Sequence, residues 1–164
     1  MKDKIVIITG ASSGIGKALA YEFGRKGSHV VLAARNLKEL QIIAEDLTSQ
    51  GIKALAVKTD VTSETDCRHL IDAAIATFGR IDILINNAGI SMRALFVDLQ
   101  LDVMRRLMDT NYWGTVYCTK FAMPHLLKTK GSLVGVISIG GYIGMPGRSA
   151  YAASKFAVRG FLDT

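Results

Sequence analysis

The chain has 164 residues, of which 49% are apolar, and its mean hydropathy is +0.28. This length suits one domain with a sizeable core, and the apolar excess is typical of parallel strands buried on both faces. The 20 basic and 14 acidic residues give a formal charge of +6, but the basic residues are scattered, which argues against a nucleic-acid partner and indicates a solvated surface that attracts an anionic ligand.

The hydrophobic pattern alternates along the chain between short apolar runs and helical periodicity. Such βαβα alternation predicts a parallel, doubly wound sheet with right-handed crossovers. Ser63 is the expected N-cap of the third helix. Strands are expected at residues 4–9, 28–34, 53–58, 81–86 and 133–138, and helices at 17–26, 37–50, 63–78, 101–108, 111–128 and in the segment that carries Tyr151.

A glycine-rich turn joins the first strand to the first helix. Strand, glycine-rich turn and helix in this order form a phosphate-binding start of a dinucleotide fold, because glycines let the backbone approach a pyrophosphate and a helix N-terminus favours negative charge. The spacing is G-x-x-x-G-x-G rather than the G-x-G-x-x-G of the common fingerprint, and an ordinary turn is the alternative. The residues expected to hold the ligand here are Gly10, Ser12, Ser13, Gly14, Ile15 and Gly16.

Polar segments also follow the other expected strands. Open α/β sheets bind ligands at the carboxyl ends of their strands, so segments at these ends should lie together. Each has a structural alternative when taken alone, since residues 86–89 suit a turn and Asp60 suits a helix cap. Their shared location favours a site that contains Arg35, Asp60, Val61, Asn87, Ala88, Gly89 and Ser138.

Tyr151 and Lys155 lie four residues apart in the last expected helix, which places them on one face. A tyrosine has an ordinary pKa of about 10, and a neighbouring cation lowers that pKa towards neutrality. Such a pair suits proton transfer. Alone, the spacing is far better explained by a solvated lysine and a half-buried tyrosine that share a helix face, so the other motifs must carry the interpretation.

Together these motifs resemble the short-chain dehydrogenase/reductase family, in its order and approximate spacing, over the whole chain. The resemblance implies a Rossmann-like sheet of at least five strands in the order 3-2-1-4-5 with helices on both faces. It also implies a single dinucleotide-binding domain over residues 1–164 and an NAD(P)-dependent oxidoreductase acting on a small carbonyl or alcohol. The motifs that carry it are residues 9–16, 60–61 and 86–89, Asn111, Ser138, Tyr151 and Lys155.

By this resemblance, Tyr151 is the general acid/base, and Lys155 lowers its pKa and binds the nicotinamide ribose. Ser138 holds the substrate oxygen and Asn111 supports a water in the proton relay. These roles suit the chemistry, because hydride transfer to a carbonyl carbon builds negative charge on oxygen, which needs a positioned donor and a proton. The alternatives are a strand-end hydroxyl that caps the backbone at Ser138 and a helix N-cap at Asn111.

The residue after the second strand bears on cofactor choice, because it usually meets the adenosine ribose. An acidic residue there binds a free 2′-hydroxyl and repels a phosphate. This chain has Arg35 at that place and no acid until Glu39. We therefore expect NADP(H) to be preferred over NAD(H), with Arg35 pairing the 2′-phosphate. The alternative is an exposed arginine that opens a helix.

Members of the family normally continue beyond the point that corresponds to Thr164. The resemblance thus implies a domain that is incomplete at its C-terminal side and lacks its last strands and a mobile segment of the substrate pocket. It also implies a homo-oligomer built through the helices that flank the fifth strand. A truncated, non-catalytic nucleotide-binding or oligomerising protein is the alternative. Residues 91–96 and 140–145 are expected to form a mixed, fairly apolar wall of the substrate pocket.

The sequence predicts no membrane span, no export signal and no metal site. The charge-free stretch 131–147 is interrupted by glycines, and its strand is too short to cross a bilayer. The first four residues lead directly into a strand, without a signal peptide's apolar region, so a cytoplasmic location is expected. Cys67 and Cys118 are too far apart in the sequence, and too differently placed, for a zinc or redox motif; both are expected on helices as small buried side chains.

Overall fold

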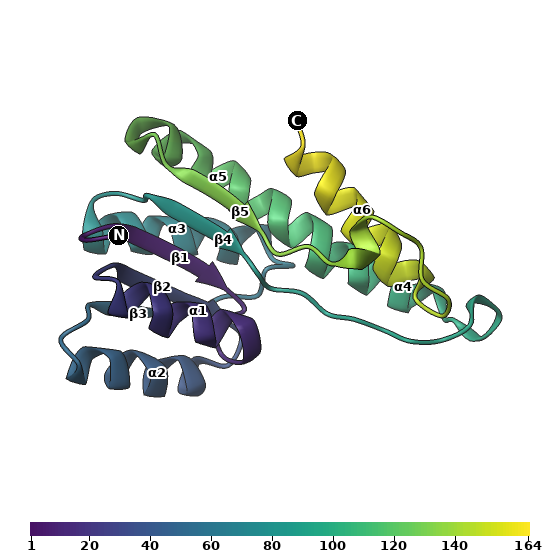
Figure 1. Ribbon diagram of the computed structural model, residues 1–164, viewed down its shortest axis with the longest axis horizontal. Coiled ribbons are helices and arrows are strands. Elements are labelled where there is room, and N and C mark those ends of the chain that lie inside the picture. Colours follow the sequence, from purple (N-terminus) through teal and green to yellow (C-terminus); the bar gives the residue numbers. More distant parts are fainter.

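The computed structural model describes all 164 residues and contains one five-stranded parallel sheet (Figure 1). The strand order is β3-β2-β1-β4-β5, which confirms the predicted order. The central strand β1 pairs with β2 on one side and β4 on the other, so that Ile7 lies opposite both Val31 and Leu84. The strands are β1 (Ile5–Thr9), β2 (His29–Ala34), β3 (Ala54–Lys58), β4 (Ile83–Asn86) and β5 (Ser132–Gly135).

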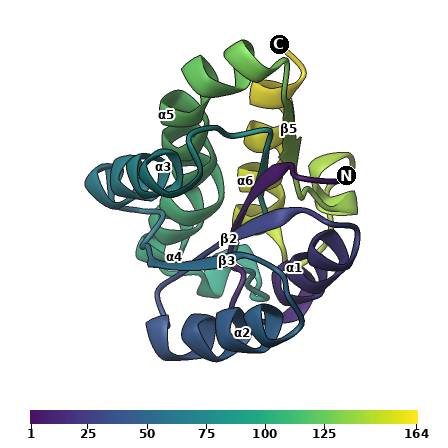
Figure 2. The ribbon, with the colours of Figure 1, turned by 90° about the vertical axis from the view of Figure 1, so that its left-hand side faces the viewer.

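Helices cover both faces of the sheet, as the doubly wound prediction requires (Figures 1 and 2). Alternate residues of β1 enter different cores. Val6 and Ile8 pack with buried side chains of α1 and α2, whereas Ile5 and Ile7 pack with those of α3 and α5. The helices are α1 (Gly14–Arg25), α2 (Leu37–Ser49), α3 (Glu64–Phe78), α4 (Leu101–Leu107), α5 (Gly114–Thr129) and α6 (Ser149–Leu162).

Helix α1 begins at Gly14 rather than at residue 17, and β4 begins at Ile83 rather than at residue 81. Two further predicted boundaries are wrong in ways that affect the site. The helical path is not broken between residues 108 and 111, because a wider π-helical segment, Met108–Trp113, links α4 to α5 without interruption. Strand β5 ends at Gly135 rather than at Ser138; Val136 still donates a backbone hydrogen bond to Asn86, and the chain then leaves the sheet. Ser138 therefore lies in the loop beyond the strand, where it precedes a short 3₁₀ turn, Ile139–Gly141.

The two cysteines lie on α3 and α5, fully buried as expected, but their placement relative to one another differs from the prediction. Both are free thiols of the same core, and a hydrogen bond to Cys67, together with burial, raises the pKa of the Cys118 thiol. Helix packing thus brings together two residues that are 51 positions apart (118 minus 67) in the sequence.

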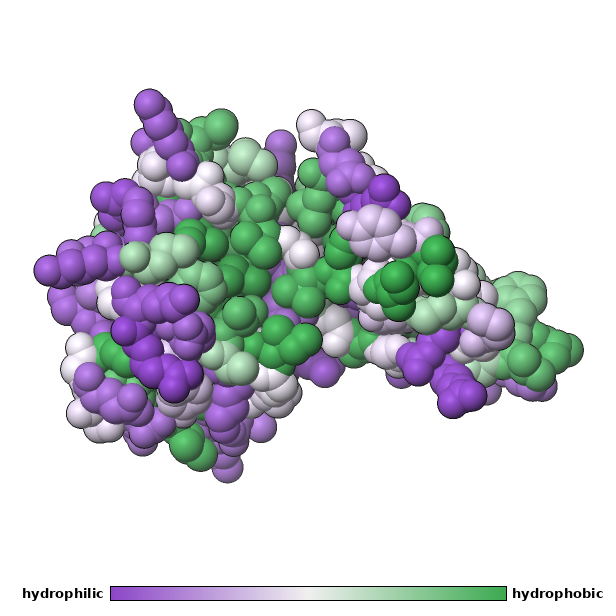
Figure 3. All heavy atoms as spheres, viewed as in Figure 1, coloured by the Kyte–Doolittle hydropathy of each residue, from purple (hydrophilic) through white to green (hydrophobic).

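The surface is uneven in its polarity. In Figure 3, hydrophilic side chains dominate around α1 and α2, whereas apolar side chains form a band across the middle and gather again at the projecting end. No helix combines the length and the apolar character that a membrane span requires. The large apolar side chains that are exposed before and at the start of α4 are Leu95, Phe96, Val97 and Leu101.

An ionic cluster fixes the end of the sheet opposite the carboxyl ends of the strands. The Asp82 side chain is 2% exposed and accepts hydrogen bonds from the Lys4 ammonium at 2.9 Å, the Ile5 N–H at 3.0 Å and the Arg80 guanidinium at 2.6 and 3.0 Å. Burial alone raises the pKa of this carboxyl, but the three donors outweigh burial and hold the pKa below its ordinary value. The charged form is thus the one that the fold stabilises.

We predict that Asp82→Asn lowers the free energy of unfolding by about 2 kcal/mol at neutral pH, because it removes charge-assisted hydrogen bonds. A carboxyl with a depressed pKa in the folded state contributes stability above its unfolded pKa of about 3.9, and the contribution is lost as the pH falls through the folded value. Urea unfolding should therefore show a difference from wild type that disappears in strong acid. Asp102→Asn, at an exposed pair with Arg105, is the control and should change little. A deficit that persists unchanged in acid would contradict the ionic account.

Candidate active site

The glycine-rich turn after β1 is locked to the loop after β4. The Thr9 hydroxyl accepts hydrogen bonds from the N–H groups of Asn87 and Ala88, both at 3.0 Å, and the Asn87 amide donates to the Thr9 carbonyl at 2.8 Å. Gly10 has a φ of +67° and lies so close to Ala88 that a Cβ would meet its Cα at 2.9 Å. Only glycine satisfies both conditions there.

A cavity of about 510 Å³ opens at this edge of the sheet. It lies where the carboxyl ends of β1, β2, β3 and β4 meet, as predicted for a doubly wound fold. Gly16 alone among the predicted turn residues does not line it; Gly16 instead packs behind the turn, against Gly10 and Asn87. The predicted residues in its wall are Gly10, Ser12, Ser13, Gly14, Ile15, Arg35, Asp60, Val61, Asn87, Ala88 and Gly89.

Five further residues of this wall were missed from the sequence. Each of them adjoins a predicted position in the chain, which is the signal that was available. They have small or uncharged side chains without a motif of their own. They are Ala34, Asn36, Thr59, Ile90 and Thr110.

Arg35 is exposed at the rim of the cavity and forms no ion pair, although many other basic residues do. It does not open the next helix as a cap, because the Asn36 side chain is the N-cap of α2 and accepts from the Glu39 N–H. The Glu39 carboxylate is itself occupied by Lys17 of α1 at 3.0 Å. The first acidic side chain after β2 is therefore engaged elsewhere.

Asp60 does not cap α3 either. Its carboxylate accepts from the N–H and the hydroxyl of Thr62, and the Ser63 side chain is the N-cap of α3, as predicted. The Asp60 N–H donates to Asp66, and this bond, followed by one from the Ser63 hydroxyl, lowers the pKa of the Asp66 carboxyl. These short bonds fix the loop that carries Asp60 and Val61 into the cavity wall.

A second cavity, of about 350 Å³, adjoins the first, since Ile15, Asn87, Gly89 and Ile90 line both. Its wall combines side chains from the loops after β4 and β5 with two from α6. Ser138, Tyr151 and Lys155 are among them, so the structure brings three of the four predicted catalytic residues together. The remaining lining residues are Ser91, Val136 and Ile137.

Lys155 and Tyr151 share one face of α6, with the Lys155 ammonium 6.0 Å from the centroid of the Tyr151 ring. Lys155 is only 7% exposed and donates to the Val136 carbonyl at 2.9 Å. Burial lowers the pKa of this ammonium below its ordinary value. A partly desolvated cation thus lies beside the phenol, with no carboxylate to neutralise it.

Ser138 is held near Tyr151 because the 3₁₀ turn that follows Ser138 packs against the tyrosine ring. The Ser138 hydroxyl oxygen accepts from the Gly140 N–H at 3.2 Å, which is the backbone-capping role weighed as an alternative. In that bond the hydroxyl oxygen is only an acceptor, so the hydroxyl proton can still be donated to a ligand. A Cβ on Gly140 would lie 3.3 Å from the Tyr151 ring, so the turn and the ring are in close contact.

Asn111 is 1% exposed and lies outside the walls of both cavities. It is not a helix N-cap, because it sits inside the π-helical segment. Its amide accepts from the Ile90 N–H at 2.8 Å and donates to the Ile90 carbonyl and to the Ser154 hydroxyl. Ser154 in turn donates to the Tyr151 carbonyl, so one buried network joins the loop after β4 to the helix that carries Tyr151.

Comparisons with known proteins agree with this geometry. Residues 4–164 match the family described as short chain dehydrogenase. The chain belongs to that family. A member from Arabidopsis thaliana, 11-beta-hydroxysteroid dehydrogenase-like 4A, is 45% identical over 163 residues, which are 98% of this chain and 54% of that protein. A second relative, 11-beta-hydroxysteroid dehydrogenase A of Sesamum indicum, is 42% identical over 98% of this chain and 47% of its own length. The chain spans about half the length of the curated relatives it matches.

Solved short-chain dehydrogenase structures superpose closely on this chain. An alcohol dehydrogenase from Thermococcus sibiricus, complexed with 5-hydroxy-NADP, gives a TM-score of 0.97 at 26% identity and covers 99% of this chain and 69% of its own. A 7 alpha-hydroxysteroid dehydrogenase complexed with NADH and 7-oxo glycochenodeoxycholic acid gives 0.93 at 30% identity and covers 98% and 63%. The sheet and its surrounding helices thus have the architecture of these structures.

We predict that Gly16→Ala destabilises the protein by about 1–3 kcal/mol, because the new methyl group would overlap the Gly10 carbonyl oxygen and lie 2.6 Å from the Asn87 amide nitrogen. Gly160→Ala is the matched control in α6, where no neighbouring atom lies within 4 Å of the added Cβ. It should stabilise the protein by about 0.5–1 kcal/mol through helix propensity. Denaturant unfolding measures both, and changes of the same sign would refute the close-approach argument.

Proposed function

We propose that this chain belongs to an oxidoreductase that transfers a hydride between NADP(H) and a ketone or secondary alcohol, with Tyr151 as general acid/base. The observation that carries the proposal is the shared cavity wall of Ser138, Tyr151 and Lys155, next to the cavity that the glycine-rich turn bounds. Solved relatives in complex with NAD, NADH and 5-hydroxy-NADP support a nicotinamide cofactor.

The residues present fit such a cofactor. Gly10 and Gly14 both have positive φ angles, and no neighbouring atom fills the space that a Cβ on Gly14 would occupy. The backbone there is open to a pyrophosphate at the start of α1. We place the adenosine half in the larger cavity and the nicotinamide half in the smaller one, with Ile15 and Asn87 where they meet. The proposed contacts are Gly10, Ser12, Ser13, Gly14, Ile15, Arg35, Asp60, Val61, Asn87, Ala88, Gly89, Tyr151 and Lys155; Gly16 supports the turn from behind.

The side chains around the second cavity divide the proton chemistry. When bound, the nicotinamide supplies or accepts the hydride. The Tyr151 phenol gives its proton to the substrate oxygen as negative charge develops there, and the Ser138 hydroxyl donates a second hydrogen bond to the same oxygen. Lys155 holds the ribose and keeps a positive charge 6.0 Å from the centre of the Tyr151 ring. In the reverse direction Tyr151 accepts the alcohol proton.

Asn111 holds this arrangement in place from outside the cavities. A Cβ on Gly89 would lie 3.1 Å from the Asn111 amide oxygen and 3.5 Å from the Lys155 ammonium, so all three groups are close neighbours. By holding both backbone groups of Ile90, the Asn111 side chain keeps the loop after β4 against Lys155. We assign it this positioning role and the support of a water in the proton relay.

We also propose that the phosphorylated cofactor is preferred. Arg35 has no ion-pair partner at the rim of the larger cavity, and Glu39, the nearest following acid, is held by Lys17. A guanidinium without a partner suits a 2′-phosphate, which it binds with two parallel hydrogen bonds. No acidic side chain follows β2 directly to favour a free 2′-hydroxyl.

We predict that Tyr151→Phe reduces the turnover of ketones with NADPH by about 100-fold or more, because the proton donor is lost while the ring remains. NADPH binding, followed by its fluorescence, should stay within about twofold of wild type, since removal of one hydroxyl leaves most contacts. Tyr117→Phe, in a ring stacked on Trp113, is the control and should keep full turnover. Turnover that survives in Tyr151→Phe would overturn the assignment; cofactor binding by wild type with no turnover of any carbonyl would favour the non-catalytic alternative.

We predict that wild type binds NADPH more tightly than NADH and that Arg35→Ala removes about 10- to 100-fold of the NADPH affinity, as expected for a charged hydrogen-bonding pair. The affinity for NADH should change little, because that cofactor has no 2′-phosphate. Arg25→Ala, at the far end of α1, controls for the loss of one positive charge. Fluorescence titration with both cofactors measures this preference, and equal affinities of wild type for NADPH and NADH would contradict the proposed preference.

A further inference from the structure

Two segments meet at the mouth of the cavity that contains Tyr151. The Ala94 N–H donates to the Gly147 carbonyl at 3.0 Å, which joins the loop after β4 to the loop before α6. The Arg148 guanidinium donates to the Ser91 hydroxyl, and Ser91 is part of the cavity wall. Arg148 thus reaches across the opening from one loop to the other.

Arg148 also lies close to the reacting centre. Its guanidinium carbon is 6.0 Å from the centroid of the Tyr151 ring, the same separation as that of the Lys155 ammonium. Arg148 is half-buried and directly precedes α6, three residues before Tyr151. Arg148 is not itself a lining residue of the cavity, but it is hydrogen-bonded to the lining residue Ser91, so its charge lies next to the space in which a substrate would bind.

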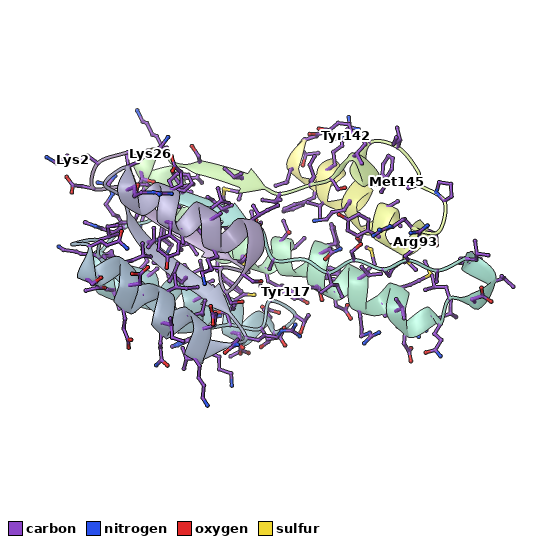
Figure 4. All side chains as sticks on the ribbon, turned by 60° about the horizontal axis from the view of Figure 1, so that its bottom comes forward. Lys2, Lys26, Arg93, Tyr117, Tyr142 and Met145 are labelled. Atoms are coloured by element: carbon purple, nitrogen blue, oxygen red, sulfur yellow. The ribbon has the colours of Figure 1, made fainter.

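Arg148 has no acidic partner. Four of the nine arginines form ion pairs, and Arg148 and Arg93 are among the five that form none. The hydrogen bond to Ser91 is the single one that the Arg148 side chain makes, so most of its five N–H donors are free. Arg93 lies on the facing loop, with its Cγ 3.8 Å from the position of a Cβ on Gly147; Figure 4 shows it beside the loop that carries Met145.

The cavity offers no negative charge to these arginines. Its wall contains no aspartate or glutamate, and its one charged side chain is Lys155, which already donates to Val136. A neutral substrate would leave two guanidinium groups unpaired at the mouth. An anionic group would pair with them through charge-assisted hydrogen bonds.

We propose that Arg148, assisted by Arg93, binds an anionic group of the substrate, which is then a carbonyl compound or alcohol that carries a carboxylate or a similar anion a few bonds from the reacting carbon. This inference rests on the proposed function for the position of the carbonyl. The guanidinium anchors the anion at the mouth, while Ser138 and Tyr151 bind the oxygen deeper in the cavity. Arg148 is therefore a specificity-determining residue for the same site.

A matched pair of ketones tests the proposal. Para-acetylbenzoate and para-acetylbenzamide have nearly the same shape and differ in charge. Their dissociation constants are measured by ligand-observed NMR on the whole chain in the presence of NADP⁺, so that binding is read without turnover. We expect wild type to bind the benzoate about tenfold more tightly than the benzamide, and added salt to weaken this preference.

Substitutions test whether Arg148 causes the preference for the benzoate over the benzamide. Arg148→Gln should abolish it by weakening benzoate binding alone, and Arg148→Lys should retain part of it. Ser91→Ala breaks the bridge but keeps the cation, so the preference should survive and a merely structural role for Arg148 would be excluded. Arg25→Gln, which removes an equal charge from the far end of α1, should leave it unchanged.

Equal binding of the two ketones by wild type, no measurable binding of the benzoate, or a preference that persists in the Arg93→Gln, Arg148→Gln double variant would each overturn the proposal. Failure of the proposed function has a different signature. In that case no ketone would cause NADPH oxidation, or Tyr151→Phe would not change turnover. The preference for the benzoate is measured by binding alone and does not depend on either result.

Discussion

The close approach of β1 and β4 at their carboxyl ends is the constraint on which the site depends. Thr9 accepts three hydrogen bonds there, two from Asn87 and one from Ala88, and the approach is possible because Gly10 and Gly16 leave no side chain between the two segments. Backbone polar groups at strand ends must find partners, and these do so across the gap. The same junction forms the boundary between the two cavities, so its position sets where the two halves of a dinucleotide would meet.

A buried hydrogen-bond network around Asn111 also positions the site. The Asn111 amide bonds to Ile90 on one side and to Ser154 on the other. The π-helical segment Met108–Trp113 carries this side chain, and such segments occur often at functional sites because they alter the direction of the helix locally. The network is buried and fully hydrogen-bonded at Asn111, which makes it rigid. It therefore places the face of α6 that carries Tyr151 and Lys155 relative to the loop after β4, although Asn111 itself lines neither cavity.

Much of the fold was predictable because its signals are local. Short apolar runs separated by helical periodicity predicted the parallel, doubly wound sheet, and the family resemblance implied its strand order. Ser63 was recognisable as the N-cap at the start of a helical pattern. The errors occurred where tertiary contacts override local pattern. The apolar run at 133–138 looks like one strand, yet pairing with β4 ends at Gly135, and Asp109-Thr110 looks like a helix boundary, yet α4 and α5 are continuous through it.

The sequence by itself determined the chemical types in the site: the glycines of the turn, a basic residue after β2, and a tyrosine and a lysine one helical turn apart. Those features depend on backbone conformation and on spacing within one element, which the order of residues encodes directly. Only the tertiary structure decided that Ser138 contacts the turn beside Tyr151, that Asn111 lies outside the cavities, and that Ser91 and Arg148 meet at the mouth. Each of these relations joins segments far apart in the chain, and their distances depend on how the helices pack on the sheet rather than on any local preference.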